Sequence, residues 1–389
     1  MNLLKHIFSV HNEKAHKIVV FCGFKIKFRS VKAENILLKS ENSRLKEQID
    51  SLNKKNKKLS DKNASEIKKS EEYLKIIAKN ADLYEQNILI PKKINDDIKN
   101  TEIAQKELSE ILGCKEFPLF TSIEIETVNR CCGECAFCPV NKYDDTREYK
   151  LMSEDLFKNI IRQLKDINYD GRMQLFSNNE PLMDKRIFEF AKYAKEQLPN
   201  NHFSFFTNGM LLDMEKFHKL IPYCDTFCID IYYSEDEKIP DNIFPIVDYC
   251  VEHKELQSKV IVNMIDKNAI RNNRGGNSKN RKEVYKLKCP CLLPFKQMIV
   301  RPDGKVSLCC NDALGEYTLG DLTQNSITEI WNGQSFWEVR NKLKLGREEI
   351  KMCEYCDNFG GFGTNAAKDY VYTKEHFQKS WNKIKSYLN

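Results

Sequence analysis

The sequence lacks several features that would each assign it to a broad class of protein. Its 389 residues contain no apolar run long enough to cross a bilayer, so no membrane-spanning helix is expected. Residues 1–11 have neither the apolar core nor the cleavage site of a secretory signal, so a cytoplasmic protein is expected. Positive and negative charges nearly balance, with 62 Lys and Arg against 56 Asp and Glu, so no nucleic-acid partner is expected.

Cysteine is the residue that the sequence has in excess. The chain contains 15 cysteines, and an odd number without a secretion signal favours metal ligands over a disulfide framework. Most of them lie in three groups along the chain: Cys131, Cys132, Cys135 and Cys138; Cys289, Cys291, Cys309 and Cys310; Cys353 and Cys356. The others are scattered, mostly beside apolar residues, and are expected to be buried thiols: Cys22, Cys114, Cys224, Cys228 and Cys250.

The first 30 residues form a small block of alternating apolar and basic side chains. Residues 17–21 and 24–28 are predicted to be the two strands of a β-hairpin, with its turn at Cys22 and Gly23. Such a hairpin either packs on another part of the protein or makes a weak peripheral contact with a membrane or a partner, through Lys25, Lys27 and Arg29. The block also resembles a short N-terminal segment of bacterial surface-polysaccharide biosynthesis proteins, including glycosyltransferases.

Residues 33–62 have the periodicity of a coiled coil. Leucine recurs every seven residues, which is the pattern of a d-position seam: Leu38, Leu45, Leu52 and Leu59. The a positions are mostly asparagine, which specifies register at a cost in stability: Asn35, Asn42, Ile49 and Asn56. A short coil that forms a homodimer is the favoured interpretation, and a solvated helix or disordered linker is the alternative. Residues 63–115 are predicted to be a helical linker interrupted near Pro91, so that 31–115 form one segment.

From residue 116 the pattern changes to alternating strands and helices. Strand-like runs are predicted at 120–126, 173–177, 203–207, 226–232 and 259–264, with helices between them at 153–167, 184–197, 213–220 and 241–253. Repeated βα units form a parallel sheet with helices outside it. The strand number predicts an α/β fold, a partial (β/α)6 TIM-like barrel rather than a complete eightfold one, which needs about 250 residues. The core domain is placed at 116–286.

The first cysteine group follows the first predicted strand. Cys131, Cys135 and Cys138 are spaced so that three thiolates in one loop can converge on a single iron–sulfur cluster. A [4Fe–4S] cluster normally takes four cysteines, so three ligands leave one iron open to a small molecule. A structural zinc loop is the alternative, but Cys132 is adjacent to Cys131 and is poorly placed to supply the fourth ligand.

This loop, with Phe137 before its last cysteine, closely resembles the signature of radical S-adenosylmethionine (SAM) enzymes. Further segments match the family in order: Asn178-Asn179-Glu180-Pro181-Leu182, Thr207-Asn208-Gly209, Cys228-Ile229-Asp230-Ile231 and Asn273-Arg274-Gly275-Gly276. Asparagine replaces both glycines that the family has before Glu-Pro, which puts the backbone approach to SAM in doubt. The resemblance implies contacts with SAM or substrate from Phe137, Asn179, Glu180, Asn208, Asp230 and Arg274, and it does not identify the catalytic acid or base.

The C-terminal segment, residues 287–389, contains the remaining two cysteine groups and a predicted C-terminal helix. A hairpin turn at 302–304 is predicted to bring Cys309 near Cys291, and Cys353 and Cys356 supply two more thiolates. Four thiolates bind either a closed cluster or a zinc ion. Residues 289–358 resemble the SPASM or twitch auxiliary-cluster domain, which implies one auxiliary [4Fe–4S] cluster on Cys291, Cys309, Cys353 and Cys356. Cys289 and Cys310 are possible substitutes for their neighbours.

The resemblance implies reductive cleavage of SAM to a 5′-deoxyadenosyl radical that abstracts hydrogen from a substrate. A closed cluster beside the radical source favours a dehydrogenase-type oxidoreductase, and the N-terminal block favours a sugar or sugar-nucleotide of bacterial surface polysaccharides. The alternatives are a peptide maturase, whose winged-helix recognition domain is not evident in residues 1–115, and a non-catalytic iron–sulfur scaffold. A flavodoxin or ferredoxin is the expected reductant.

Overall fold

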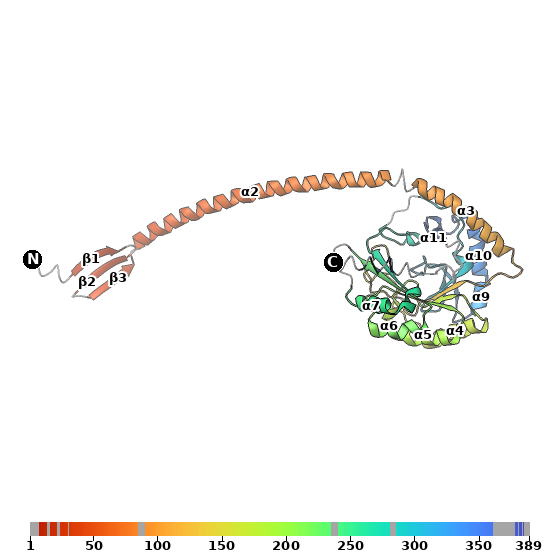
Figure 1. Ribbon diagram of the computed structural model, residues 1–389. Coiled ribbons are helices and arrows are strands. Elements are labelled where there is room, and N and C mark those ends of the chain that lie inside the picture. Colours follow the sequence, from red (N-terminus) through yellow and green to blue (C-terminus); the bar gives the residue numbers. More distant parts are fainter. Residues whose placement is uncertain are drawn as a thin grey trace, which may run out of the picture. The chain divides into compact units, whose positions relative to one another are not determined.

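The chain forms two compact units, Met1–Asn87 and Ile88–Asn389 (Figure 1). The computed structural model describes residues 8–13, 16–21, 24–29, 31–84, 90–234, 240–280, 285–360, 378, 379, 381, 382 and 384. The turn predicted at Cys22 and Gly23 lies outside these residues, as does most of the predicted C-terminal helix. In the described part of the chain, no helix combines the length and the apolar character that a membrane crossing requires.

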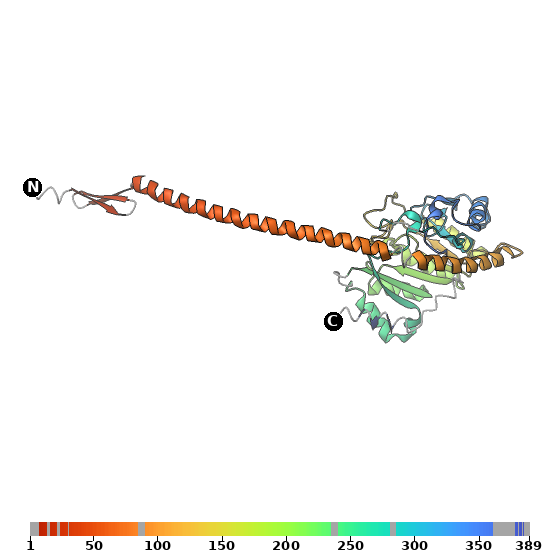
Figure 2. The ribbon, with the colours of Figure 1, turned by 90° about the horizontal axis from the view of Figure 1, so that it is seen from above.

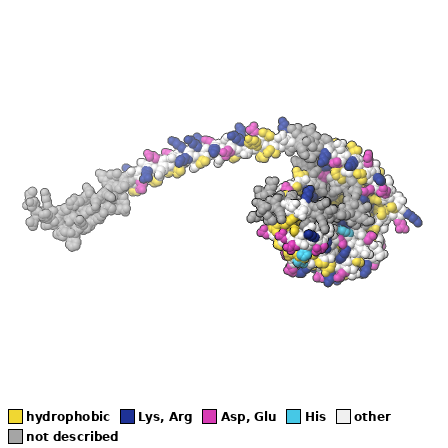
Figure 3. Space-filling model, in the orientation of Figure 1, with side chains coloured by type: hydrophobic (Ala, Val, Ile, Leu, Met, Phe, Trp, Pro, Cys, Tyr) yellow, Lys and Arg dark blue, Asp and Glu magenta, His cyan; other side chains and the backbone are white. Residues whose placement is uncertain are grey.

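The first unit contains a small antiparallel sheet and one long helix. The sheet consists of β1 (Phe8–Glu13), β2 (His16–Phe21) and β3 (Phe24–Arg29), in that order. The β2–β3 pair is the predicted hairpin, and β1 adds a strand that the sequence analysis did not predict. Helix α2 runs without a break from Val31 to Tyr84, so the helix extends 22 residues beyond the predicted seam. Basic, acidic and apolar side chains are mixed along α2 (Figure 3).

The second unit is built on an eight-stranded sheet with the order β11-β10-β9-β4-β5-β6-β7-β8. Its bounds confirm the predicted strand series: β4 (Ser122–Ile125), β5 (Arg172–Gln174), β6 (His202–Thr207), β7 (Thr226–Tyr233) and β8 (Val260–Asp266). These five strands pair in parallel with one another, and β9 (Gln297–Val300) pairs in parallel with β4. The sixth parallel strand therefore comes from the cysteine-rich segment, and the sheet continues across the domain boundary predicted at 286.

Amphipathic helices cover one face of this sheet. Helices α4 (Glu154–Asp166), α5 (Ile187–Gln197), α6 (Met214–Leu220) and α7 (Phe244–Glu252) lie side by side there (Figure 1), and short 3-10 turns occur at Pro181–Met183, Ile221–Tyr223, Lys254–Ser258 and Arg274–Gly276. In α4, Ser153 caps the first turn by accepting a hydrogen bond from the Leu156 N–H, and Phe157, Ile160 and Leu164 are buried. The apolar spacing is that of a single helical face packed on a core.

Strand alternation gives the two faces of the sheet different chemistry. In β4, Ile123 and Ile125 join the hydrophobic core, while the intervening Glu124 is also buried. Gln174 stands opposite Glu124 on β5, and its neighbour Met173 belongs to the core. Parallel strands buried on both faces are normally apolar on both. A buried polar face therefore marks the side of the sheet where a functional site is expected.

The cysteine-rich segment extends the sheet and then forms short helices. After α8 (Leu293–Lys296) and β9, the chain turns into β10 (Lys305–Ser307) and later β11 (Thr318–Asp321), followed by α9 (Ile327–Trp331), α10 (Gln334–Leu343) and α11 (Lys351–Glu354). Strands β9 and β10 pair antiparallel, so the hairpin predicted at 302–304 is confirmed. Gly304 has a φ of +84°, a conformation that favours glycine.

Helix α3 (Ile90–Leu112) belongs to the second unit, although its residues were predicted to be part of a linker. The helix begins at Ile90 with Pro91 in its first turn, a position where the missing N–H of proline costs nothing. Ala104 and Leu108 are buried in the main core of the unit. Helix α3 is thus a packed part of the unit that contains the cysteine groups (Figure 2).

Trp331 is the largest fully buried side chain of the second unit, and its removal is expected to destabilise the chain. Its indole N–H donates to the Pro118 carbonyl at 3.0 Å, and the Arg340 guanidinium lies 4.0 Å from its ring centroid. Trp331→Ala should lower the free energy of unfolding by about 3–5 kcal/mol. Trp337 is half exposed, so Trp337→Ala should change the free energy of unfolding by no more than about 0.5 kcal/mol in denaturant titrations. Equal losses would contradict the packing described.

Candidate active site

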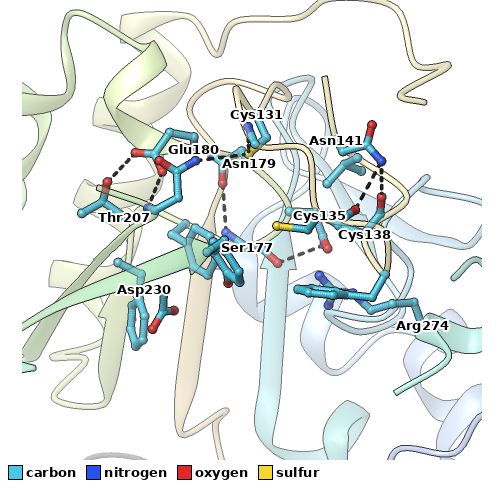
Figure 4. Close-up of a pocket in the computed structure, with 18 residues that line it drawn as sticks. Cys131, Cys135, Cys138, Asn141, Ser177, Asn179, Glu180, Thr207, Asp230 and Arg274 are labelled. Atoms are coloured by element: carbon cyan, nitrogen blue, oxygen red, sulfur yellow. Dashed lines mark hydrogen bonds between the residues drawn. The ribbon is translucent and has the colours of Figure 1, made fainter. Parts of the chain in front are cut away.

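A pocket opens at the carboxyl ends of the central strands, where the first cysteine loop follows β4 (Figure 4). Its walls come from that loop, from the segment after β5, from the ends of β6 and β7 and from Arg274 after β8, as in other β–α folds whose sites lie at this edge. The lining residues are Cys131, Gly133, Cys135, Phe137, Cys138, Val140, Asn141, Phe176, Ser177, Asn178, Asn179, Glu180, Phe206, Thr207, Asn208, Asp230, Tyr232 and Arg274. All six side chains predicted to contact SAM or substrate therefore line one pocket, together with the three loop cysteines.

Hydrogen bonds within the cysteine loop hold its three thiols toward the pocket. The Asn141 side-chain amide donates to the Cys138 carbonyl at 2.9 Å, and the Cys138 N–H donates to the Cys135 carbonyl at 3.1 Å. The Gly133 N–H lies 3.3 Å from the Cys131 sulfur, and a Cβ at Gly133 would lie 3.4 Å from it. Cys132 is not among the pocket-lining residues, and its sulfur accepts from the Asn208 amide at 3.4 Å. The loop thus presents three thiols and no fourth.

Glu180 connects the Asn-Asn-Glu-Pro segment to the end of β6. Its carboxylate accepts hydrogen bonds from the Asn208 N–H at 2.7 Å and from the Thr207 hydroxyl at 2.8 Å, and Leu182 donates a third. Burial raises the pKa of Glu180 to about 7, and these three hydrogen bonds oppose the increase. A carboxylate offers about four acceptor sites, so one remains for a donor in the pocket.

Asn179 has a buried side-chain nitrogen without a hydrogen-bond partner in the described residues. Its side-chain oxygen accepts from the Ser177 N–H at 3.1 Å, while its buried amide nitrogen has no hydrogen-bond partner in the described residues. An unsatisfied buried donor costs about 1–3 kcal/mol unless a ligand or water satisfies it. The carboxylate of a bound amino acid group, as in SAM, is an acceptor of the kind that this nitrogen and its surroundings fit.

Aromatic and polar groups from β7 and β8 form the wall opposite the cysteine loop. Asp230 accepts from the Asn263 amide at 2.8 Å and from the Cys228 thiol at 3.4 Å, and burial raises its pKa. The Phe137 and Tyr232 rings lie 5.8 Å apart. Cys228 on this wall and Phe137 on the cysteine loop are buried, and Asp230 is half-buried.

Several residues that the sequence analysis did not single out support the loop from behind. The Arg147 guanidinium pairs with Asp145 at 2.9 Å and with Glu126 at 3.6 Å, and it donates to the Asn178 carbonyl at 3.2 Å. Glu126 in turn accepts from the Asn178 N–H at 2.6 Å. Arg147 thereby ties the cysteine loop to the Asn178 segment. No local motif distinguishes it from other surface-type arginines in the sequence.

A second cysteine set lies beside the pocket, and Arg274 connects the set to the pocket. The set consists of the six C-terminal cysteines Cys289, Cys291, Cys309, Cys310, Cys353 and Cys356. Arg274 lines the pocket and donates to the Cys310 carbonyl at 3.4 Å. Burial raises the pKa of Cys309 above its ordinary value, and charge repulsion from nearby cysteines adds to this increase: Cys310, Cys291, Cys353 and Cys356. The four thiols predicted for the auxiliary site therefore lie within electrostatic reach of one another.

The donor set of the second site is entirely sulfur. Cys291, Cys309, Cys353 and Cys356 are all buried and free of disulfides. In the described part of the chain, no group of three or more Cys, His, Asp or Glu side chains is arranged to hold a single metal ion. In a [4Fe–4S] cluster each thiolate binds a different iron, so its ligands stand farther apart than those of one ion. Four thiols in a buried site fit the chemistry of such a cluster.

The profiles of two known protein families match this sequence. The sequence profile of the radical SAM superfamily matches residues 125–261, and that of the SPASM iron–sulfur cluster-binding domain matches residues 289–357. S-adenosyl-L-methionine-dependent 2-deoxy-scyllo-inosamine dehydrogenase of Niallia circulans is 25% identical over 255 residues, covering 65% of this chain and 98% of the relative. The crystal structure of BtrN with AdoMet and 2-DOIA is 25% identical with a TM-score of 0.56, covering 65% of this chain and 99% of that one.

The chain belongs to the radical SAM superfamily and carries a C-terminal SPASM-type domain. Its cofactors are accordingly a SAM-binding [4Fe–4S] cluster, SAM and an auxiliary iron–sulfur cluster. The resemblance drawn from the sequence is therefore confirmed, and zinc is disfavoured at both cysteine sets. The assignment of individual ligands and SAM contacts stays a prediction, supported by the pocket that gathers those residues.

Glu126 is expected to make the stability of the chain depend on pH. Burial raises its pKa from 4.5 to about 7, and Arg147 opposes the increase. The folded state thus holds this proton more tightly, so the stabilisation is full below pH 4.5 and is lost as the pH rises through about 7. The shift corresponds to about 3 kcal/mol.

The corresponding experiment compares melting temperatures across this pH range. The melting temperature of Glu126→Gln should fall less between about pH 5 and pH 8 than that of the parent, because glutamine is neutral at every pH. Glu154→Gln is the control. Glu154 is exposed and its pKa is lowered from 4.5, so the melting temperature of this variant should fall as that of the parent does. Parallel curves for the parent and Glu126→Gln would show that Glu126 titrates normally.

Proposed function

We propose that the chain is a radical SAM dehydrogenase that oxidises an alcohol of a sugar or sugar-nucleotide to a carbonyl. The observation that carries this proposal is the polar face of the sheet beside the pocket. Gln297 on β9 donates to the Glu124 carboxylate at 2.7 Å, and both side chains are buried. Asn178, which lines the pocket, donates to the Cys310 carbonyl at 3.1 Å. This polar region therefore adjoins both the pocket and the second cysteine set.

Many buried polar atoms in this region have no hydrogen-bond partner in the described residues. They include side-chain oxygens of Gln174, Gln297, Asn178 and Ser307 and both amide atoms of Asn311. Native proteins leave few buried polar groups unpaired, so this concentration points to a ligand or ordered water. A polyhydroxylated ring offers alternating donors and acceptors that suit amide side chains. The aminocyclitol named for the Niallia circulans dehydrogenase is a compound of this class.

When bound, the cofactors would supply a 5′-deoxyadenosyl radical and an acceptor for one electron. Oxidation of the alcohol would transfer a hydrogen atom from the substrate carbon to that radical, release the hydroxyl proton and pass one electron to the auxiliary cluster, so that a C=O bond replaces the C–H and O–H bonds. The residues of the chain orient the substrate between the two cysteine sets and exclude water. Phe137, Phe176, Phe206 and Tyr232 supply apolar walls for this purpose. A flavodoxin or ferredoxin is the proposed source of the electron that cleaves SAM.

Two other functions are less well supported. A peptide maturase would be expected to carry a recognition domain, and the described part of residues 1–115 consists of a three-stranded antiparallel sheet, α2 and α3. A non-catalytic scaffold would not require Glu180 and three cysteines around one pocket. The likeness of residues 1–30 to surface-polysaccharide proteins supports a role in polysaccharide biosynthesis.

Anaerobic incubation with SAM, reductant and a panel of sugar-nucleotides tests the substrate class, since the oxidised product lacks two hydrogen atoms.

The two cysteine sets should be separable by their effect on SAM cleavage. Cys135→Ala should abolish formation of 5′-deoxyadenosine, because the loop cluster requires all three thiolates. The Cys353→Ala and Cys356→Ala double variant should retain some 5′-deoxyadenosine under strong reductant and lose substrate oxidation. Cys114 is exposed and lies outside both sets, so Cys114→Ala is the control and should keep both activities. Substrate oxidation at the parent rate by the folded double variant would contradict an electron-accepting role.

The exposed leucine seam of α2 supports a homodimer. Leu38, Leu45, Leu52 and Leu59 are each about half exposed, at 49–58%. Leu45→Glu with Leu52→Glu should convert the dimer to a monomer in sedimentation at roughly tens of micromolar, because charged d positions oppose the coil. Ser40→Glu with Lys54→Glu changes two outward f positions of the same helix and should leave the dimer intact. A parent chain that sediments as a monomer would leave the seam without this role.

A further inference from the structure

Cys289 has a different environment from the four thiols of the auxiliary site. Its N–H donates to the Asp97 carboxylate at 2.9 Å, and its carbonyl accepts from the Arg347 guanidinium at 2.8 Å. Arg347 also lies 3.4 Å from the Cys289 sulfur. The backbone and the thiol of Cys289 are thus both engaged by charged side chains, and the residue is fully buried.

Asp97 comes from α3, which lies outside both profile matches. Its side chain is 2% exposed, and its carboxylate also accepts from the Lys288 N–H at 2.7 Å and the Tyr285 hydroxyl at 2.9 Å. Burial alone would raise its pKa, but these hydrogen bonds outweigh burial and lower it. The group is therefore an anion at neutral pH. A second tie from α3 is the Lys93–Asp357 ion pair at 3.3 Å, one residue after Cys356.

Arg347 is a buried cation whose contacts in the described residues are carbonyl oxygens and a thiol. It is 1% exposed and donates to the Cys356 carbonyl at 3.3 Å and to the Asn358 carbonyl at 2.6 Å. A buried charge is costly unless an opposite charge lies nearby. A cluster held by four thiolates is anionic, so it supplies the charge that this guanidinium otherwise lacks.

Cys291 lies in the same buried cluster as Cys309 and Cys353, whereas Cys289 does not belong to that cluster. Gly360 approaches Cys291 so closely that a Cβ there would lie 3.0 Å from its sulfur. Cys291 is separated by one residue from Cys289, so fixing Cys289 on both sides fixes the position of its neighbour.

We propose that Asp97, Cys289 and Arg347 form a buried polar relay that positions Cys291 as the cluster ligand and sets the reduction potential of the auxiliary cluster. In this relay Cys289 is a positioning residue and not a ligand. Helix α3 is then a functional part of the auxiliary site. Groups hydrogen-bonded around a metal ligand orient it and tune the metal, and the charge near an iron–sulfur cluster is one determinant of its potential. The inference rests on the auxiliary cluster and is independent of the substrate.

The first test compares the two cysteines in the full-length chain reconstituted anaerobically with iron and sulfide. Cys289→Ala should keep about eight irons per chain and the parent electron paramagnetic resonance spectrum of both clusters. Cys291→Ala should lose about half of the iron and the auxiliary signal. A folded Cys289→Ala variant, judged by circular dichroism, that loses half of its iron would overturn the proposal, because Cys289 would then be a ligand.

The second test measures the midpoint potential of the auxiliary cluster by redox titration. Asp97→Asn removes a buried negative charge and should shift the potential to a more positive value, because the reduced cluster is the more negative form. Selective loss of auxiliary iron in this variant would equally support the positioning role. The matched control is Asp96→Asn, which changes the adjacent, only half-buried carboxyl on α3 and should behave as the parent.

Equal iron content and equal potentials for Asp97→Asn and Asp96→Asn would overturn the relay. Arg347→Gln should shift the midpoint potential of the auxiliary cluster in the opposite direction, to a more negative value, because it removes a positive charge. All of these measurements are made without SAM and without substrate. A failure of the sugar-oxidation proposal would therefore leave their outcome unchanged, and the two proposals can fail separately.

Discussion

The parallel pairing of β4 with β9 is the contact on which the arrangement of the two cysteine sets depends. Ser122 stands opposite Gln297 and Ile125 opposite Val300, so two segments more than 170 residues apart share one register. The first cysteine loop follows β4 directly, and β9 leads through its hairpin to Cys309. With the two strands in register, Asn178 and Arg274 of the pocket both donate to the Cys310 carbonyl, so the pocket lies next to the auxiliary thiols.

The polar face of the sheet is stable only because the opposite face is apolar. Burial raises the pKa of Glu124, Glu126 and Glu180, and each of these shifts reflects the cost of holding an ionised carboxyl away from water. The helices packed on the other face bury a continuous hydrophobic core that offsets this cost. Function is thus confined to one side of the sheet, where strand alternation places every second residue.

The segment after β8 joins the pocket to the auxiliary site. The Asn273 N–H donates to Asp357 at 2.7 Å, and its amide also donates to the Tyr355 carbonyl, next to Cys356. Gly275 has a φ of +62°, and a Cβ there would lie 2.6 Å from Met352, so only glycine permits this approach. Between them, Arg274 enters the pocket. One short segment therefore contacts both sites, which makes their geometries interdependent.

The sequence by itself determined the local features of this protein. Strand and helix periodicity predicted β4–β8 and the helices between them, and the spacing of Cys131, Cys135 and Cys138 identified the family, because each depends on residues close together in the chain. Only the tertiary structure decided that β9 completes the parallel sheet, that α3 packs on the cysteine-rich segment, and that Asp97 and Arg347 surround Cys289. These contacts join segments between 58 and 192 residues apart through complementary shape and hydrogen bonding, and no local periodicity records such a match.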